Sequence, residues 1–132
     1  MIKKSSGFTL IELMIVLVIL GLLASLVAPQ MFSKVSSTKI KTAKAQMQMF
    51  QTALDTYRLD VGDYPNNLQE LVDSNQANWD GPYIPKAIPN DPWGNPYQFK
   101  VPGEDGSPFT MLSLGKDGKV GGEGESADVI HQ

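Results

Sequence analysis

An apolar run near the start of the chain constrains the fold more than any other feature. It extends from Phe8 to Ala28, is followed by Pro29, and contains one charged residue, Glu12. At a rise of about 1.5 Å per residue, a helix of this length matches the hydrocarbon thickness of a bilayer. The sequence therefore predicts a membrane-spanning helix that carries a single carboxylate near its beginning.

A short basic segment, residues 1–7, precedes the apolar run. An ordinary secretory signal is cleaved after its apolar region and is lost together with it. Here the small residue Gly7 stands before the apolar region, so a cut after Gly7 would leave the membrane helix on a chain that starts at Phe8. The residues from Lys3 to Leu13 resemble the class III leader of type IV pilins and type II secretion pseudopilins.

Glu12 has two interpretations, which helix physics alone leaves open. Thr9 and Glu12 have the spacing of a capping box, in which Thr9 caps the helix and Glu12 reaches back to its start. Alternatively, a carboxylate in hydrocarbon is tolerated when it is paired. The resemblance implies that Glu12 pairs with the new amine of Phe8 on a neighbouring subunit, and that this amine is N-methylated. The cap could hold in the membrane and the pair could form on assembly.

Composition leaves room for one small soluble domain. The chain has 132 residues, 11 Lys and Arg, 14 Asp and Glu, and no Cys. A disulfide framework is therefore excluded, and small exported domains often need another staple, such as a bound metal. Most acidic residues follow Asp55, which argues against a nucleic-acid surface on the soluble part. The lysines between Lys34 and Lys44 are interpreted as a solvated helix face.

A second helical pattern follows the apolar run. Its apolar residues recur at alternating steps of three and four and form one face, which predicts an amphipathic helix packed on a small core. They are Ile40, Ala43, Met47, Phe50, Leu54, Tyr57 and Val61. The helix should end at Gly62, because Pro65 is close behind.

Gly21 lies inside the predicted first helix, and Pro29 lies at the end of its apolar part. Because proline lacks an amide donor and clashes with the preceding turn, we expect the helix to bend or loosen near Pro29. An ordinary kink tolerated by the bilayer is the alternative. The resemblance implies that helix is lost between Gly21 and Pro29 in the assembled filament.

The remaining chain predicts a small antiparallel sheet. Asn66 or Asn67 should cap a short helix to Val72, and closely spaced prolines between residues 81 and 94 exclude a helix or a central strand. Residues 97–101 and 109–114 alternate as strands do, with turn residues between them. The predicted fold class is therefore α+β, with a long N-terminal helix followed by strands, as in the pilin-like fold.

The glycine-rich acidic tail, residues 114–128, has two interpretations. Chemistry alone favours a flexible acidic tail, although calcium binds about six to eight oxygens of the kind such a loop offers. The segments 91–97 and 113–118 resemble the major pseudopilin of type II secretion, the general secretion pathway protein G family. This resemblance implies a calcium loop. Its ligands would be the Asp117 and Asp128 carboxylates, the Leu114 and Lys119 carbonyls and an oxygen of Ser126, with Glu123 or Glu125 as possible replacements.

Enzymatic motifs are not found: no nucleophile motif, phosphate loop or zinc spacing appears. We expect His131 to lie in a mobile end. Trp79, Trp93, Tyr83 and Tyr97 are interpreted as core and loop anchors.

The resemblance implies three segments: a cleaved leader (1–7), a transmembrane and assembly helix (8–29) and a periplasmic pseudopilin domain (30–132). It implies a non-enzymatic subunit, single-pass in the bacterial inner membrane, that polymerises into the periplasmic pseudopilus and drives export of folded proteins. Its partners would be copies of itself, minor pseudopilins, the prepilin peptidase, and the inner-membrane assembly platform with its ATPase. The alternatives are a type IV pilin or competence pseudopilin serving adhesion, motility or DNA uptake, and a membrane-anchored periplasmic binding module that does not assemble.

Overall fold

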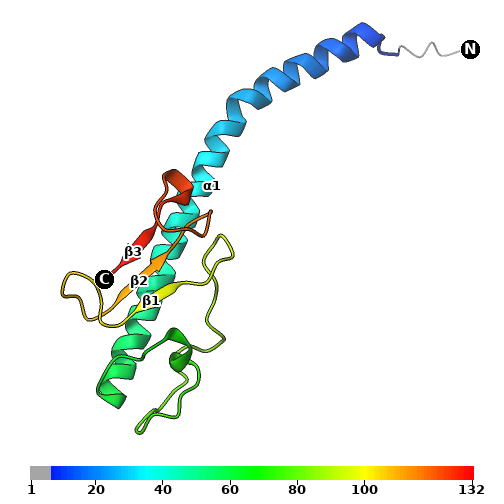
Figure 1. Cartoon of the computed structure of the whole chain (residues 1–132). Coiled ribbons are helices and arrows are strands. Elements are labelled where there is room, and N and C mark those ends of the chain that lie inside the picture. Colours follow the sequence, from blue (N-terminus) through cyan, green and yellow to red (C-terminus); the bar gives the residue numbers. More distant parts are fainter. Residues whose placement is uncertain (1–6) are drawn as a thin grey trace, which may run out of the picture. The chain divides into compact units, whose positions relative to one another are not determined.

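The computed structural model describes residues 7–132, and residues 1–6 of the predicted leader lie outside this range. The elements follow in the order α1 (Leu10–Val61), η1 (Leu68–Leu71), β1 (Gln98–Lys100), β2 (Thr110–Ser113), η2 (Gly124–Ser126) and β3 (Val129–His131) (Figure 1). The chain divides into two compact units, one up to Ser36 and one from Ser37 to the end. The predicted long helix followed by a small antiparallel sheet is confirmed.

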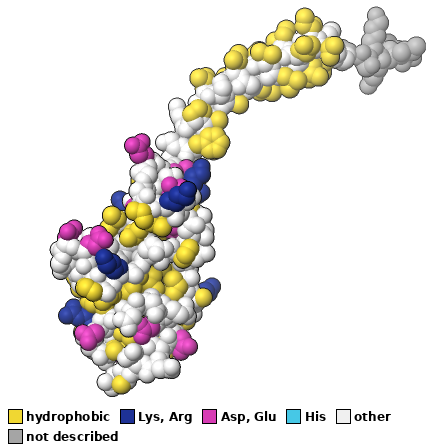
Figure 2. All heavy atoms as spheres, in the orientation of Figure 1, with side chains coloured by type: hydrophobic (Ala, Val, Ile, Leu, Met, Phe, Trp, Pro, Cys, Tyr) yellow, Lys and Arg dark blue, Asp and Glu magenta, His cyan; other side chains and the backbone are white. Residues whose placement is uncertain are grey.

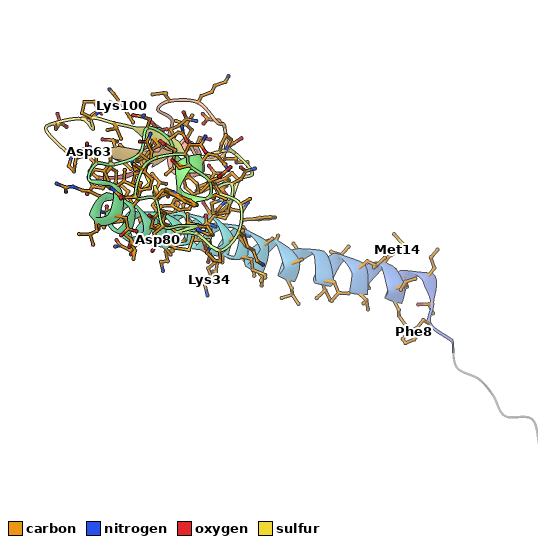
Figure 3. The ribbon with its side chains drawn as sticks, turned by 90° about the horizontal axis from the view of Figure 1, so that it is seen from below. Phe8, Met14, Lys34, Asp63, Asp80 and Lys100 are labelled. Carbon is orange, nitrogen blue, oxygen red and sulfur yellow. The ribbon has the colours of Figure 1, made fainter. Side chains whose placement is uncertain are left out.

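The first unit contains the apolar part of α1. Its large hydrophobic side chains are exposed, with Phe8 at 88% and Leu10 at 77%. Hydrophobic side chains cover this part of the helix in Figure 2, and the side chains of Phe8 and Met14 project outward in Figure 3. Length and composition allow α1 to cross a membrane. The helix continues through Gly21 and Pro29, while the predicted break concerns the assembled filament and stays a prediction.

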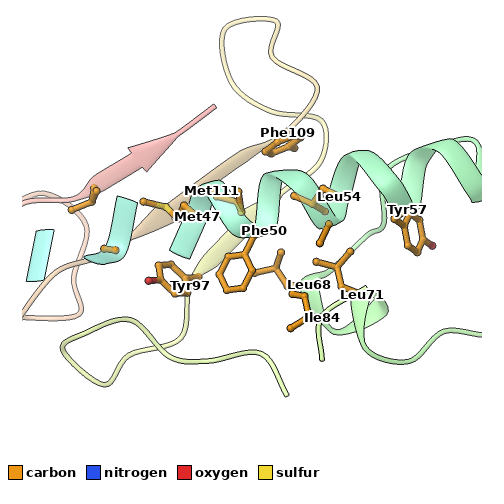
Figure 4. Packing of buried hydrophobic residues seen from close by; sticks show 13 residues of the cluster. Met47, Phe50, Leu54, Tyr57, Leu68, Leu71, Ile84, Tyr97, Phe109 and Met111 are labelled. Carbon is orange, nitrogen blue, oxygen red and sulfur yellow. The ribbon is translucent and has the colours of Figure 1, made fainter. Parts of the chain in front are cut away.

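The second unit has a core built on one face of α1. The predicted stripe is confirmed, since Ala43, Met47, Phe50 and Leu54 are fully buried and Tyr57 nearly so. Figure 4 shows Met47, Phe50 and Leu54 facing side chains from η1, the following loop and the sheet. The partners that complete the core are Leu68, Leu71, Ile84, Tyr97, Phe109, Met111 and Val129. Burial of apolar area on this scale is the main force that folds a domain of this size.

The end of α1 and the next turn follow the predicted signals. Gly62 has φ +109° and its N–H donates to the Arg58 carbonyl at 2.8 Å, which terminates the helix. The short helix is a 3₁₀ helix rather than an α-helix, with Asn67 as its cap: Asn67 Oδ1 accepts from the Glu70 N–H at 3.2 Å. Leu68 and Leu71 are thereby directed into the core.

The sheet has the order β1-β2-β3, and both pairings are antiparallel. The predicted hairpin is confirmed, with Gln98 opposite Leu112 and Lys100 opposite Thr110. The sequence analysis did not predict β3, which pairs Val129 with Ser113. The expectation of a mobile end at His131 is wrong, because His131 lies in β3 and its Nε2 is 3.1 Å from Gln51 Oε1 on α1. Val129 is buried and Ile130 is exposed, a difference that the structure shows and that two consecutive apolar residues do not signal in the sequence.

Candidate assembly and metal sites

The start of α1 shows half of the predicted capping box. Thr9 Oγ1 accepts a hydrogen bond of 3.2 Å from the Glu12 N–H. Within residues 7–132, the structure records no hydrogen bond or ion pair of the Glu12 carboxylate, and Glu12 is exposed. The carboxylate therefore stands free on the apolar surface of α1, within the described part of the chain. Gly7 and Phe8 are exposed directly before the helix.

The predicted metal loop connects β2 to β3 and folds back on itself. Lys116 N–H donates to the Glu125 carbonyl at 2.9 Å, so the beginning of the loop lies against η2. Gly115 has φ +74°, and a methyl group there would come within 2.7 Å of the Glu125 carbonyl oxygen and 2.8 Å of that of Ala127. This close backbone approach requires glycine. Residues 114–118 and 124–128 are therefore held side by side.

The two predicted carboxylate ligands make different local contacts. Asp117 is exposed, and its Oδ1 accepts from the Lys119 N–H at 3.1 Å. Asp128 Oδ2 accepts from the Gly121 N–H at 3.0 Å. Asp128 Oδ1 is buried without a hydrogen-bond partner among the described residues. An unpaired buried oxygen of this kind destabilises a fold by about 1 to 3 kcal/mol.

Ser126 lies in the last turn of this loop, and Leu114 stands at its beginning. Ser126 N–H donates to the Glu123 carbonyl at 3.0 Å, and the Ser126 carbonyl oxygen would lie 2.4 Å from a methyl group at Gly122. Leu114 directly precedes Gly115 and is partly buried. The structure therefore brings the segments of all five predicted ligands into one folded loop.

The acidic side chains of this loop, Asp117, Glu123, Glu125 and Asp128, do not gather into one cluster. No group of three or more His, Cys, Asp and Glu residues in the described range 7–132 is placed to hold a metal. Glu125 is directed elsewhere, with Oε1 3.5 Å from Trp93 Nε1 and Oε2 3.9 Å from Lys116 Nζ. A cation in this loop would therefore depend on carbonyl oxygens as well as on Asp117 and Asp128, which is a ligand set that calcium accepts and softer metals do not favour.

A buried carboxylate beside the loop was missed by sequence reasoning. Asp91 is 4% exposed and receives three hydrogen bonds, from the Ser113 hydroxyl at 2.6 Å and the N–H groups of Asn95 at 2.8 Å and Trp93 at 3.1 Å. Gly94 N–H also donates to the Asp91 carbonyl at 2.9 Å. The Asp, Gly and Asn spacing at residues 91–95 signals a turn, but it does not indicate that this carboxylate is buried.

Tyr97 connects this turn with the core. Its ring packs edge-on against Phe50 with centroids 5.3 Å apart, and its hydroxyl donates to Gln46 Oε1. Burial of the phenol raises the pKa of Tyr97 strongly, and the nearby Asp91 charge raises it further. The predicted role of Tyr97 as an anchor is confirmed by these contacts.

A long helix that begins with an exposed apolar half and a lone carboxylate, followed by a three-stranded antiparallel sheet and a folded C-terminal loop, defines a pilin-like subunit. The family model described as "Type II secretion system (T2SS), protein G" matches residues 30–132, and that of the "Prokaryotic N-terminal methylation motif" matches residues 2–28. The chain belongs to the type II secretion system protein G family.

Relatives from several bacteria agree with this assignment. The type II secretion system core protein G of Pseudomonas aeruginosa is 44% identical over 135 residues, which cover 96% of this chain and 94% of the relative. The core protein G of Vibrio cholerae is 40% identical over 96% of this chain and 91% of its own length.

A solved structure supports the same fold. The crystal structure of the major pseudopilin from the type 2 secretion system of enterohaemorrhagic Escherichia coli matches with a TM-score of 0.64 and 28% identity, over 76% of this chain and 91% of that chain. Together with the family membership, this match makes the chain a pseudopilus subunit of a type II secretion system.

Proposed function

We propose that the apolar part of α1 anchors the chain in the inner membrane and that the unit from Ser37 onward lies in the periplasm. The subunit then leaves the membrane and polymerises with copies of itself into the pseudopilus, whose growth drives export of folded proteins. The observation that carries this proposal is the apolar surface of α1 before Ser36, which no other part of the described chain covers. Such a surface needs lipid or other helices around it.

The proposed partners follow from this role. They are minor pseudopilins, the prepilin peptidase that cuts between Gly7 and Phe8 and methylates the new amine, and the inner-membrane assembly platform with its ATPase. The match of the N-terminal methylation motif to residues 2–28 supports the peptidase step. The role proposed for the subunit itself is structural and not enzymatic.

Glu12 is proposed to select the axial register of the filament. A carboxylate in hydrocarbon is stabilised by a cationic partner, and the amine of Phe8 on a neighbouring subunit would supply one. The exposed position of Glu12 on α1, with its N–H and not its carboxylate bound to Thr9, supports this pairing.

Assembly in cells that express the secretion machinery tests the Glu12 proposal. Glu12→Ala should abolish pseudopilus filaments in electron micrographs and in shearing assays, while the subunit still accumulates in the membrane. Glu12→Gln is the matched control for size, and it should fail as well because the charge is missing. Filaments at the normal level in either variant would refute the pairing.

We further propose that the loop 114–128 binds calcium. Asp117 and Asp128 would supply carboxylates, Leu114 and Lys119 main-chain carbonyls, and Ser126 an oxygen. The unpaired buried Oδ1 of Asp128 supports the site most directly. Bound calcium would add its binding free energy to the stability of the fold and close the loop without a disulfide.

Thermal unfolding of the full chain in detergent tests this second proposal. The melting temperature should be higher in calcium than in EGTA, and Asp128→Asn or Asp117→Ala should remove most of the difference. Asp73→Ala, an exposed aspartate outside the loop, is the control and should keep it. A wild-type chain that melts at the same temperature in calcium and in EGTA would refute the metal site.

A further inference from the structure

Asp91 lies outside the proposed ligand set, yet it contacts two residues that hold the metal loop. Its carboxylate is nearly fully buried at 4% exposure, and both oxygens are engaged. Oδ2 accepts from the Ser113 hydroxyl at 2.6 Å, and Oδ1 accepts from the Asn95 N–H at 2.8 Å. One carboxylate thus fixes the end of β2 and the turn before β1 in a common position.

Ser113 and Asn95 both bind Gly115. The Gly115 N–H donates to Ser113 Oγ at 3.2 Å, and Asn95 Nδ2 donates to the Gly115 carbonyl oxygen at 3.0 Å. Both polar main-chain groups of Gly115 are therefore held by residues that Asp91 holds in turn. The Ser113 hydroxyl is a relay, since it donates to Asp91 while it accepts from Gly115.

The N–H of Gly115 and the carbonyl of Leu114 belong to the same planar peptide unit. Fixing the N–H fixes the direction of the carbonyl, and chains of hydrogen bonds polarise one another, which makes that carbonyl oxygen more negative. Leu114 is one of the proposed main-chain ligands of calcium.

We propose that Asp91 is a positioning residue for calcium, which acts through Ser113 and Asn95 on the Leu114–Gly115 peptide. The inference rests on the proposed calcium function of the loop. Outer partners that orient metal ligands typically contribute about 10- to 100-fold to metal affinity. We therefore expect their removal to weaken calcium binding in addition to lowering the stability of the fold.

Ser113→Ala interrupts the relay, and Thr110→Val is its matched control. Both hydroxyls are buried on β2, and Thr110 Oγ1 accepts the Glu104 N–H at 2.9 Å in the hairpin loop instead of in the metal loop. Each variant leaves one N–H without its hydroxyl acceptor, so both should lower the melting temperature in EGTA. Only Ser113→Ala should change the affinity for calcium.

Isothermal titration of calcium into the chelator-treated full chain in detergent measures this affinity. We expect the dissociation constant to rise at least about tenfold in Ser113→Ala and to stay within about twofold in Thr110→Val. The proposal is overturned if Ser113→Ala binds calcium as tightly as the wild type, or if Thr110→Val weakens binding to the same extent.

Asn95→Ala provides a second variant in case Ser113→Ala does not fold. It removes the bond to the Gly115 carbonyl at a partly exposed position and should also weaken calcium binding about tenfold. An unchanged dissociation constant would overturn the positioning role while calcium binding itself still stands. A wild-type chain that binds no calcium would remove both the metal site and the inference drawn from it.

Discussion

The hydroxyl of Tyr83 donates a hydrogen bond of 2.8 Å to Asp60 Oδ2 and thereby joins the loop after η1 to the last turn of α1. The Tyr83 ring also packs edge-on against Tyr57, with centroids 5.7 Å apart. The same hydroxyl accepts from the Asp80 N–H at 2.9 Å. Because Tyr83→Phe keeps the ring and removes both bonds, it should lower the free energy of unfolding by at least about 1 kcal/mol. Chemical denaturation followed by tryptophan fluorescence measures the change.

Tyr64→Phe is the control for this substitution. Its hydroxyl donates to Asp55 Oδ1 at 3.0 Å, but at an exposed site where water replaces the partner readily. The expected loss is below about 0.5 kcal/mol. An equal loss of free energy of unfolding in the two variants would show that the Tyr83 hydroxyl contributes no more to stability than the Tyr64 hydroxyl.

The raised pKa values of three tyrosines predict that the protein loses stability at alkaline pH. Burial raises the pKa of Tyr57, Tyr83 and Tyr97 in the folded state above the ordinary value of about 10. The unfolded chain therefore loses its phenolic protons first, so this stability is present below about pH 10 and falls as the pH rises through the folded pKa values. Denaturation midpoints between about pH 8 and 11 should fall only above about pH 10, and Tyr97→Phe should make the fall shallower.

Substitution of Phe50 tests the packing of the buried apolar face of α1. Phe50 is fully buried and packs against Tyr97, so Phe50→Ala should destabilise the unit from Ser37 onward by about 3 to 5 kcal/mol through lost burial and a cavity. Leu59→Ala on the same helix is the control, since Leu59 is 85% exposed and should change stability by less than about 0.5 kcal/mol. A small loss in Phe50→Ala, measured by urea denaturation, would contradict the packing.

Two neighbouring glycines of the loop 114–128 distinguish strain in the backbone dihedral angles from strain caused by a steric contact. Gly121 and Gly122 both have positive φ, at +85° and +101°. A methyl group at Gly122 would lie 2.4 Å from the Ser126 carbonyl oxygen, whereas nothing lies within 4 Å of one at Gly121. We expect Gly121→Ala to destabilise by about 1 kcal/mol through its dihedral angle alone and Gly122→Ala by clearly more. Melting temperatures in EGTA compare the two, and equal losses would show that the contact relaxes freely.

Local patterns were sufficient to predict α1 and the hairpin. The steps of three and four from Ile40 to Val61 indicate a single buried face, and positions 97–101 and 109–114 alternate around a turn-rich segment. The predicted strands are longer than β1 and β2, because Val101 and Leu114 lie at positions where the chain already turns away from the ladder.

The parts of the fold and site that the sequence did not predict depend on contacts between residues far apart in the chain. Val129 to His131 is too short for a strand signal of its own, and it becomes β3 only because Ser113 and Gln51 lie beside it. From the sequence alone, Asp91 is an ordinary turn residue. Its burial depends on the fold, which brings Ser113, 22 positions later, within hydrogen-bond distance. The ligands of the loop were likewise proposed from the family resemblance. A glycine-rich segment has no periodicity from which its backbone conformation can be predicted.

The order β1-β2-β3 gives the loop 114–128 a further significance. Within the described chain, β2 is the strand that pairs on both sides, and the loop is its covalent link to β3. If the loop loosened, β3 would detach, and β2 would present an unpaired row of N–H and carbonyl groups of the kind on which other chains aggregate. An ordered loop therefore keeps β2 paired on both sides and leaves the shorter β3 as an edge of the sheet.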